Sequence, residues 1–181
     1  MMRTSIFKGE RISLTALHKE DLPHIVKWHQ DATFLRLLDA VAAKPKTLQE
    51  IEKWYENNRN SNNGYLFGIR DHEEQLLGYV ELDGILWNQR NGWLSIAIGA
   101  DHQGKGLGKE AMQLLLRFAF DELNLHRVQL TVFENNDRAI RLYESLGFTK
   151  EGAHREFLYR DGKNYDMFLY GLLRREWDQT K

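Results

Sequence analysis

The 181-residue sequence contains no cysteine, and this absence excludes several kinds of chemistry. Without a thiol, the chain forms no disulfide, no cysteine-ligated zinc site and no covalent intermediate on a cysteine nucleophile. A chain without cysteine is compatible with the reducing cytoplasm, which is where we expect this protein to act.

Proline, surplus charge and long apolar runs are also scarce. Only two prolines occur, Pro23 and Pro45, and neither lies in a proline-rich linker. The formal net charge is −1, which argues against a general nucleic-acid binder. No run approaches the roughly 18 apolar residues that a membrane helix needs. We therefore expect one domain over residues 1–181, with no nucleic acid and no membrane as its partner.

Hydrophobic patterning predicts alternating layers of strands and helices. Strand-like segments bounded by turn signals lie at residues 11–17, 65–70, 75–86, 93–99, 127–133, 149–159 and 165–173. Helical spacing or capping signals lie at residues 20–30, 48–58, 107–123 and 137–146. The resulting order is strand, two helices, three strands, helix, strand, helix, two strands, which predicts a mixed α/β fold.

A glycine-rich turn stands between the predicted strand at residues 93–99 and the predicted helix at 107–123. Gly104, Gly106 and Gly108 occupy alternate positions there. The start of a helix offers about four backbone N–H groups without internal partners, together with a partial positive charge. Glycines leave those amides accessible, so the turn suits a phosphate or pyrophosphate. A plain turn that needs positive φ angles is the alternative.

Two common phosphate-binding loops do not match this turn. A Walker loop needs four residues between its first glycine and the Gly-Lys pair, whereas Gly104 stands too close to Gly108 and Glu110 replaces the Ser or Thr. The dinucleotide fingerprint G-x-G-x-x-G fails because the glycines alternate. A nucleotide-binding protein such as a small GTPase is therefore disfavoured.

Two motifs resemble those of one enzyme family. The segment Gln103-Gly-Lys-Gly106-Leu-Gly108 resembles the [Gln/Arg]-x-x-Gly-x-[Gly/Ala] signature of the GNAT superfamily of acyl-CoA-dependent N-acyltransferases. Residues 136–148 resemble the family's Asn-x-x-Ala-x-x-Leu-Tyr-x-x-x-Gly-Phe stretch, at the expected distance. The C-terminal hairpin is similar to that of the branch holding ribosomal-protein N-terminal and spermidine acetyltransferases. This resemblance implies a mixed, mostly antiparallel central sheet flanked by helices.

The resemblance also implies acetyl-CoA as cosubstrate. In the family, the amides of the glycine-rich turn hold the pyrophosphate, and the preceding strand pairs with the pantetheine arm. Asn136 is an N-cap candidate, and in the family it also contacts the pantetheine or the acceptor side. The cofactor-binding residues implied in this way are Ile96, Ala97, Ile98, Gln103, Gly104, Lys105, Gly106, Leu107, Gly108, Lys109 and Asn136.

Tyr143 is the candidate general acid. Helical spacing alone makes it a core tyrosine, but in the family a tyrosine at this position protonates the departing thiolate. The general base is less defined, because residues 92–95 contain no acid where many relatives carry a glutamate. Glu81 is the candidate base and Asp83 the other nearby acid, and strand alternation places both on one face. The alternative, which the sequence supports equally, is that Glu81 and Asp83 simply lie on a solvent-exposed face of the strand.

The leading hypothesis is acetyl transfer from acetyl-CoA to a primary amine. Since no enzyme thiol exists to take the acetyl group, we expect direct attack by the amine in a ternary complex. The acceptor is left open among protein N-termini, polyamines and other small amines. A non-catalytic acyl-CoA-binding module with the same fold is the alternative. Histidines are scattered, so no metal site is expected, and the exposed hairpin edges allow a homodimer.

Overall fold

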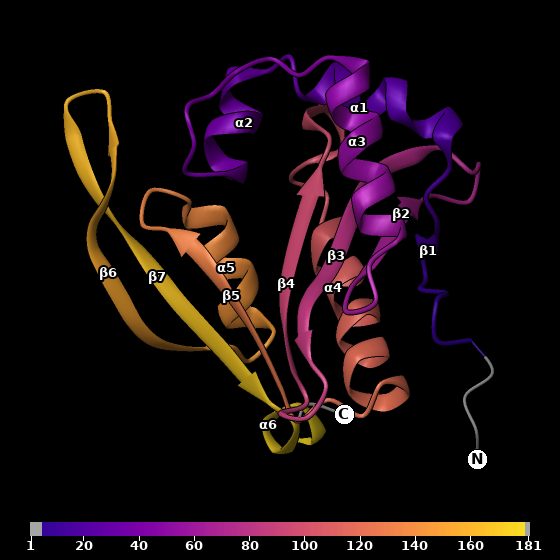
Figure 1. The fold of residues 1–181 in the computed structure, drawn as a ribbon. Coiled ribbons are helices and arrows are strands. Elements are labelled where there is room, and N and C mark those ends of the chain that lie inside the picture. Colours follow the sequence, from indigo (N-terminus) through magenta and orange to yellow (C-terminus); the bar gives the residue numbers. More distant parts are fainter. Residues whose placement is uncertain (1–4, 180–181) are drawn as a thin grey trace.

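A computed structural model describes residues 5–179 and contains a seven-stranded sheet with the order β1-β2-β3-β4-β5-β7-β6 (Figure 1). The strands are β1 (Ser13–Ala16), β2 (Tyr65–Arg70), β3 (Leu76–Leu86), β4 (Asn91–Ile98), β5 (Arg127–Phe133), β6 (Thr149–Arg160) and β7 (Lys163–Leu173). The α-helices are α1 (Leu22–Trp28), α2 (Ala32–Leu38), α3 (Leu48–Arg59), α4 (Leu107–Arg117), α5 (Asp137–Ser145) and α6 (Arg174–Asp178). The remaining helical elements are the 3₁₀ turns η1 (Lys19–Asp21) and η2 (Ala100–His102) and the π-helical segment η3 (Phe118–Glu122).

The central feature of the sheet is a short parallel contact between β4 and β5. All the remaining pairs of neighbouring strands are antiparallel, which confirms the predicted mixed, mostly antiparallel sheet. The parallel pairing covers only Asn91–Trp93 of β4, whose partners are Arg127, Val128 and Gln129 of β5. Beyond these residues the two strands diverge, as Figure 1 shows. The sheet is therefore open in its middle.

Two hydrophobic cores cover the two faces of the sheet. On one face, α4 and α5 pack through Leu115 and Tyr143 against the strands. On the other face, Ile25 of α1 and Ile51 of α3 form a smaller core, which Phe34 of α2 joins. No helix in the described part of the chain is long and apolar enough to cross a membrane.

The predicted strands are confirmed, and so are the helices predicted over residues 20–30, 48–58 and 137–146, whereas the helix predicted over residues 107–123 needs correction. The structure adds two short helices that the sequence prediction does not include, α2 and α6. α2 depends on a local signal, because the Asp31 carboxylate accepts the amides of Thr33 and Phe34 at 2.6 and 3.2 Å. The predicted helix over residues 107–123 ends as an α-helix at Arg117, and it continues as the π-helical segment η3.

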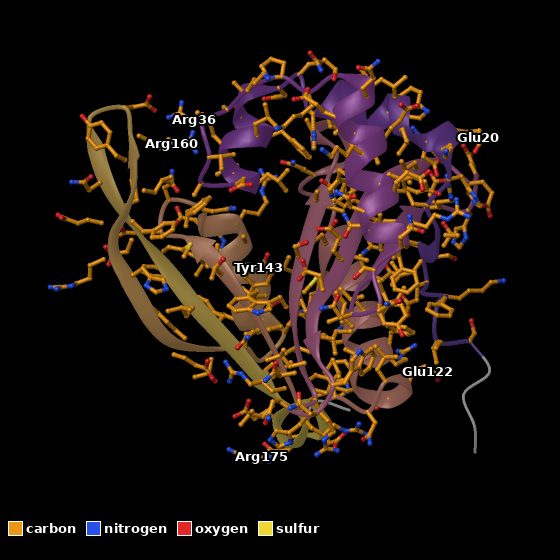
Figure 2. The ribbon with its side chains drawn as sticks, viewed as in Figure 1. Glu20, Arg36, Glu122, Tyr143, Arg160 and Arg175 are labelled. Carbon is orange, nitrogen blue, oxygen red and sulfur yellow. The ribbon has the colours of Figure 1, made fainter. Side chains whose placement is uncertain are left out.

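The tip of the β6–β7 hairpin contacts α2 and the segment that follows it. Asp161 and Gly162 have φ angles of 51° and 80°, the left-handed geometry of a tight hairpin turn. The Arg36 guanidinium lies 2.5 Å from the Asp161 carboxylate. Arg160 donates to the carbonyl oxygens of Asp39 and Val41, both at 3.1 Å. These contacts, which involve the two arginines labelled in Figure 2, hold α2 against the hairpin.

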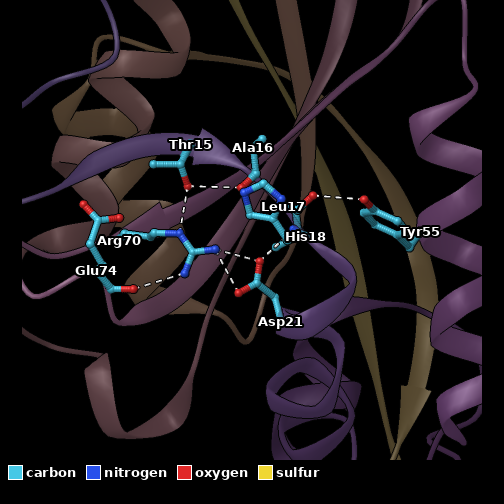
Figure 3. Close-up of polar contacts among 8 residues, drawn as sticks. All are labelled: Thr15, Ala16, Leu17, His18, Asp21, Tyr55, Arg70 and Glu74. Carbon is cyan, nitrogen blue, oxygen red and sulfur yellow. Dashed lines mark hydrogen bonds and ion pairs between the residues drawn. The ribbon is translucent and has the colours of Figure 1, made fainter.

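A buried ion pair joins the first helical segment to the sheet (Figure 3). Arg70 of β2 donates to both carboxylate oxygens of Asp21, at 2.8 and 2.7 Å, and also to the Thr15 hydroxyl at 3.0 Å. The same carboxylate accepts the backbone N–H of His18 at 2.7 Å. Only about a tenth of each charged side chain is exposed, so each charge needs the other to compensate for its loss of solvent.

Replacing Arg70 by Ala should destabilise the fold strongly. The variant leaves the Asp21 carboxylate buried without its cation, and such a change costs about 3–5 kcal/mol. Arg36→Ala is the matched control, because it breaks an ion pair whose acidic partner is largely exposed; the expected loss there is about 0–1 kcal/mol. Urea denaturation of both variants measures the difference, and equal losses would contradict it.

Candidate active site

A cavity of about 1120 Å³ occupies the opening between β4 and β5. Its walls come from these two strands, from the glycine-rich turn and the start of α4, and from α5 and α2. The limited β4–β5 pairing creates this space, because strands that stayed hydrogen-bonded along their length would leave no room between them.

The cavity passes through the sheet from one face to the other. Successive residues of a strand point to opposite faces, and both sets of β4 residues line the cavity. Leu94 and Ile96 belong to the core on the α4 and α5 face. Ala97 belongs to the core on the α1 and α3 face, so Trp93 and Ser95 share that side. The cavity thus has two mouths, here called the loop mouth, beside the glycine-rich turn and α5, and the α2 mouth.

The free edge of β4 presents backbone hydrogen-bonding groups to the cavity. Gly99 donates its amide to Leu77 of β3 at 2.9 Å, so alternation along an antiparallel pair turns the backbone groups of Ile96 and Ile98 the other way. The Ile98 carbonyl indeed accepts the Gln103 side-chain amide at 2.8 Å. The N–H and C=O of Ile96 are therefore available to an extended ligand.

The glycine-rich turn places backbone amides at the loop mouth. Gly104 and Gly106 have φ angles of 77° and 76°, which side chains rarely adopt. Gly106 is the N-cap of α4, so the first amides of that helix lack intrahelical partners. Arg11 braces the outside of the turn by donating to the Lys105 carbonyl at 2.8 Å and to the Glu110 carboxylate at 3.0 Å.

Three cationic side chains line the cavity together with these amides. They are Lys109 of α4 and Arg138 and Arg141 of α5. Arg138 donates to the Gln103 side chain, which links the end of β4 to the start of α5. Asn136 caps α5 by accepting the Ala139 amide at 3.2 Å. The combination of free amides, a helix start and basic side chains suits a phosphate-bearing ligand.

Tyr143 lies in the opening between the two strands (Figure 2). Its ring packs 5.9 Å from that of Phe148, and only 7% of the residue is exposed. Burial raises the pKa of its phenol to about 12. Within residues 5–179, the hydroxyl has no hydrogen-bonding partner, which leaves it available to a bound molecule.

Two carboxylates lie on the side of the sheet that faces α1 and α3. Asp83 lines the cavity, whereas Glu81 lies behind the wall. Glu81 accepts the Trp54 indole N–H at 3.1 Å and the Ser95 hydroxyl at 3.0 Å, and Ser95 itself lines the cavity. Burial raises the pKa of Glu81, and the nearby Asp83 charge raises it further. Partial burial also raises the pKa of Asp83.

Most of the residues predicted from the sequence meet at this cavity. Those that line it are Ile96, Ala97, Ile98, Gln103, Gly104, Gly106, Leu107, Gly108, Lys109, Asn136 and Tyr143. Lys105 does not line it and instead offers its carbonyl to Arg11. Glu81 reaches it only through Ser95, so its role as base stays a prediction.

Sequence reasoning missed the α2 wall and the two arginines of α5. α2 contributes Thr33, Phe34, Leu37 and Leu38 to the cavity. The apolar spacing i, i+3, i+4 of the last three residues, following Asp31 as a capping residue, was the available signal. Arg138 and Arg141 are three residues apart in the sequence, a helical spacing that predicts that both side chains lie on one face of α5.

Residues 11–149 match the family model of the acetyltransferase (GNAT) domain. The chain belongs to the GNAT family of acetyltransferases. A spermidine N(1)-acetyltransferase of Vibrio cholerae is 30% identical over 170 residues, covering 93% of this chain and 96% of that protein. The SPbeta prophage-derived N-acetyltransferase YokL of Bacillus subtilis is 29% identical over 179 residues, or 98% of each chain.

A solved GNAT structure resembles this fold closely. The crystal structure of the Vibrio cholerae spermidine N-acetyltransferase in complex with CoA and spermine superposes with a TM-score of 0.84 and 28% identity. The match covers 93% of this chain and 99% of that one. These similarities confirm the predicted family and enzyme class, and they support acetyl-CoA as the cosubstrate of this N-acetyltransferase.

Changing Gly104 to Ala should weaken binding of CoA. A side chain at position 104 strains the left-handed backbone, so the turn of the variant relaxes to another conformation when CoA is not bound. Binding of CoA must restore the left-handed conformation, which should raise Kd about tenfold. Gly162→Ala is the matched control, because this glycine has a φ angle of 80° and equally open surroundings, but lies at the hairpin tip. Isothermal titration with CoA should separate the two variants; unchanged Kd in Gly104→Ala would contradict the assignment.

Proposed function

We propose that the protein transfers the acetyl group of acetyl-CoA to a primary amine by direct attack in a ternary complex. The observation that carries this proposal is the cavity through the sheet, with an anion-binding turn at one mouth, a carboxylate at the other and the Tyr143 phenol along its wall. Both substrates can occupy such a cavity at once and meet where β4 and β5 diverge.

The loop mouth is the proposed entry of acetyl-CoA. The amides of residues 104–109 bind the pyrophosphate, and Lys109 adds positive charge beside them. The pantetheine arm extends along the free edge of β4, where it pairs with the backbone groups of Ile96. A backbone N–H aimed at the acetyl oxygen stabilises the negative charge that develops when the amine attacks.

The α2 mouth is the proposed entry of the amine. An ammonium group must lose a proton before its nitrogen can attack, and Asp83 is the carboxylate that the cavity exposes at this mouth. Glu81 lies one hydrogen bond behind the wall, through the Ser95 hydroxyl, and is the second acceptor for the proton. The raised pKa values of these two groups bring them closer to the range useful for a base at neutral pH.

Tyr143 is the proposed acid that completes the reaction. As the tetrahedral intermediate collapses, the carbon–sulfur bond breaks and the thiolate of CoA departs. The phenol, whose pKa of about 12 keeps it protonated at neutral pH, donates its proton to that sulfur. The nitrogen loses its second proton as the amide forms, and the Tyr143 phenolate takes up a proton from solvent. The products are CoA with a free thiol and the N-acetylated amine.

Replacing Tyr143 by Phe should lower kcat about 10²-fold or more while leaving the Kd for acetyl-CoA nearly unchanged, because the variant removes an acid and keeps the ring. Tyr55→Phe is the control. Tyr55 is similarly buried but donates to the Leu17 carbonyl outside the cavity, so the Tyr55→Phe variant should keep the kcat of the unmodified protein. Release of CoA thiol measures both. Normal turnover in Tyr143→Phe would remove the acid role.

The acidic limb of the pH profile should depend on Asp83. A carboxylate base works only when ionised, so kcat/KM should rise with pH through its raised pKa and fall below it. Asp83→Asn should lower kcat/KM about 10²-fold and flatten that limb. Glu81→Gln, which alters a group behind the wall, should preserve the limb. A limb that flattens in Glu81→Gln alone would assign the base to Glu81 instead.

A further inference from the structure

Apolar side chains are gathered at the α2 mouth. Leu37 and Leu38 of α2 and Trp93 of β4 all line the cavity, and each is 37–38% exposed. Phe34 extends this wall inward as a buried side chain. Large apolar groups that stay exposed around a cavity mouth are typical of a site that binds an apolar ligand group.

The same mouth offers little negative charge. Among the described residues that line the cavity, the acids are Asp83 and Asp137. Asp137 is the first residue of α5, next to the capping Asn136 and on the side of Arg138, so it belongs to the loop mouth. Asp83 is therefore the acid of the α2 mouth.

Glu81, Asp161 and Asp39, which lie outside the cavity lining, already have partners. Glu81 accepts hydrogen bonds from Trp54 and Ser95. Asp161 at the hairpin tip pairs with Arg36, and Asp39 accepts the Val41 amide at 3.2 Å. Recruiting any of them to a ligand would cost an existing contact. A polycation such as a linear polyamine would find one available carboxylate and an apolar wall, which is poor complementarity.

We propose that the acceptor is a primary amine with a single positive charge and an apolar, aryl or alkyl, substituent. This inference rests on the proposed function and specifies its acceptor. The ammonium group lies beside Asp83, where it loses its proton, and the substituent packs against Leu37, Leu38 and Trp93. The acceptor class thus differs from the spermine bound in the Vibrio cholerae enzyme.

A panel of amines tests this acceptor class with the full chain and acetyl-CoA. The free monoamines are 2-phenylethylamine and hexylamine, a short peptide with an N-terminal Phe represents a peptide source, and spermidine and ethanolamine are the polycationic and polar comparators. Thiol release gives kcat/KM, and mass spectrometry identifies each product. We expect 2-phenylethylamine to exceed both comparators about tenfold or more, since burying an aryl group favours binding by at least that factor.

The outcomes of this panel are distinguishable. Preference for the peptide over the free monoamines supports the same chemistry and assigns its source to a peptide N-terminus. Preference for spermidine overturns the inference and leaves the proposed function intact. If no amine is acetylated while CoA still binds, the proposed function itself fails and the inference fails with it.

A charge placed on the apolar wall provides a second test. Leu37→Asp should lower kcat/KM for 2-phenylethylamine about tenfold and raise it for spermidine, because it exchanges apolar contact for a second carboxylate. Leu37 is partly exposed, and an unchanged KM for acetyl-CoA verifies the fold. Leu48→Asp is the matched control, because Leu48 is an exposed leucine of α3 outside the cavity lining, and it should keep the monoamine preference. Equal effects of Leu37→Asp on both amines would overturn the inference.

Discussion

The candidate active site depends on the shortness of the hydrogen-bonded contact between β4 and β5. Three residues of each strand hold the two halves of the sheet together, and the remaining length of both strands is left to diverge. This short contact makes the cavity, frees one edge of β4 for a ligand backbone, and connects the two faces of the sheet. The cores on both faces keep the halves in place, so the opening is a stable part of the fold rather than a defect in it.

The strands and the glycine-rich turn could be predicted from the sequence because their signals are local. Alternation in β2 and β5, the capping box of Thr47 and Glu50, and the Asp-Gly hairpin turn each act within a few residues. α2 could not be placed in the same way. Its apolar spacing indicates a short helix but not where that helix lies, because its position depends on Arg36 and Arg160, whose partners across the α2–hairpin contact are more than 100 residues distant.

The candidate site shows the same division between local and distant information. The positions of Tyr143 and Asn136 follow from helix spacing and capping, and both residues line the cavity. Alternation correctly put Glu81 and Asp83 on one face, but it could not tell which carboxylate is accessible. That distinction depends on where β4 leaves β5 and on the hydrogen bonds from Trp54 and Ser95, which are tertiary properties.

The hairpin tip has a consequence for how an enzyme of this shape can diversify. The hairpin holds the α2 wall through Asp161, which pairs with Arg36 of α2, and through Arg160, which donates to backbone carbonyls after α2. The glycine-rich turn is braced separately by Arg11. The wall proposed to contact the amine and the turn proposed to bind the cosubstrate therefore rest on different supports. Substitutions in a surface hairpin can move one without disturbing the other, so a lineage can change what it acetylates while keeping how it binds its acetyl donor.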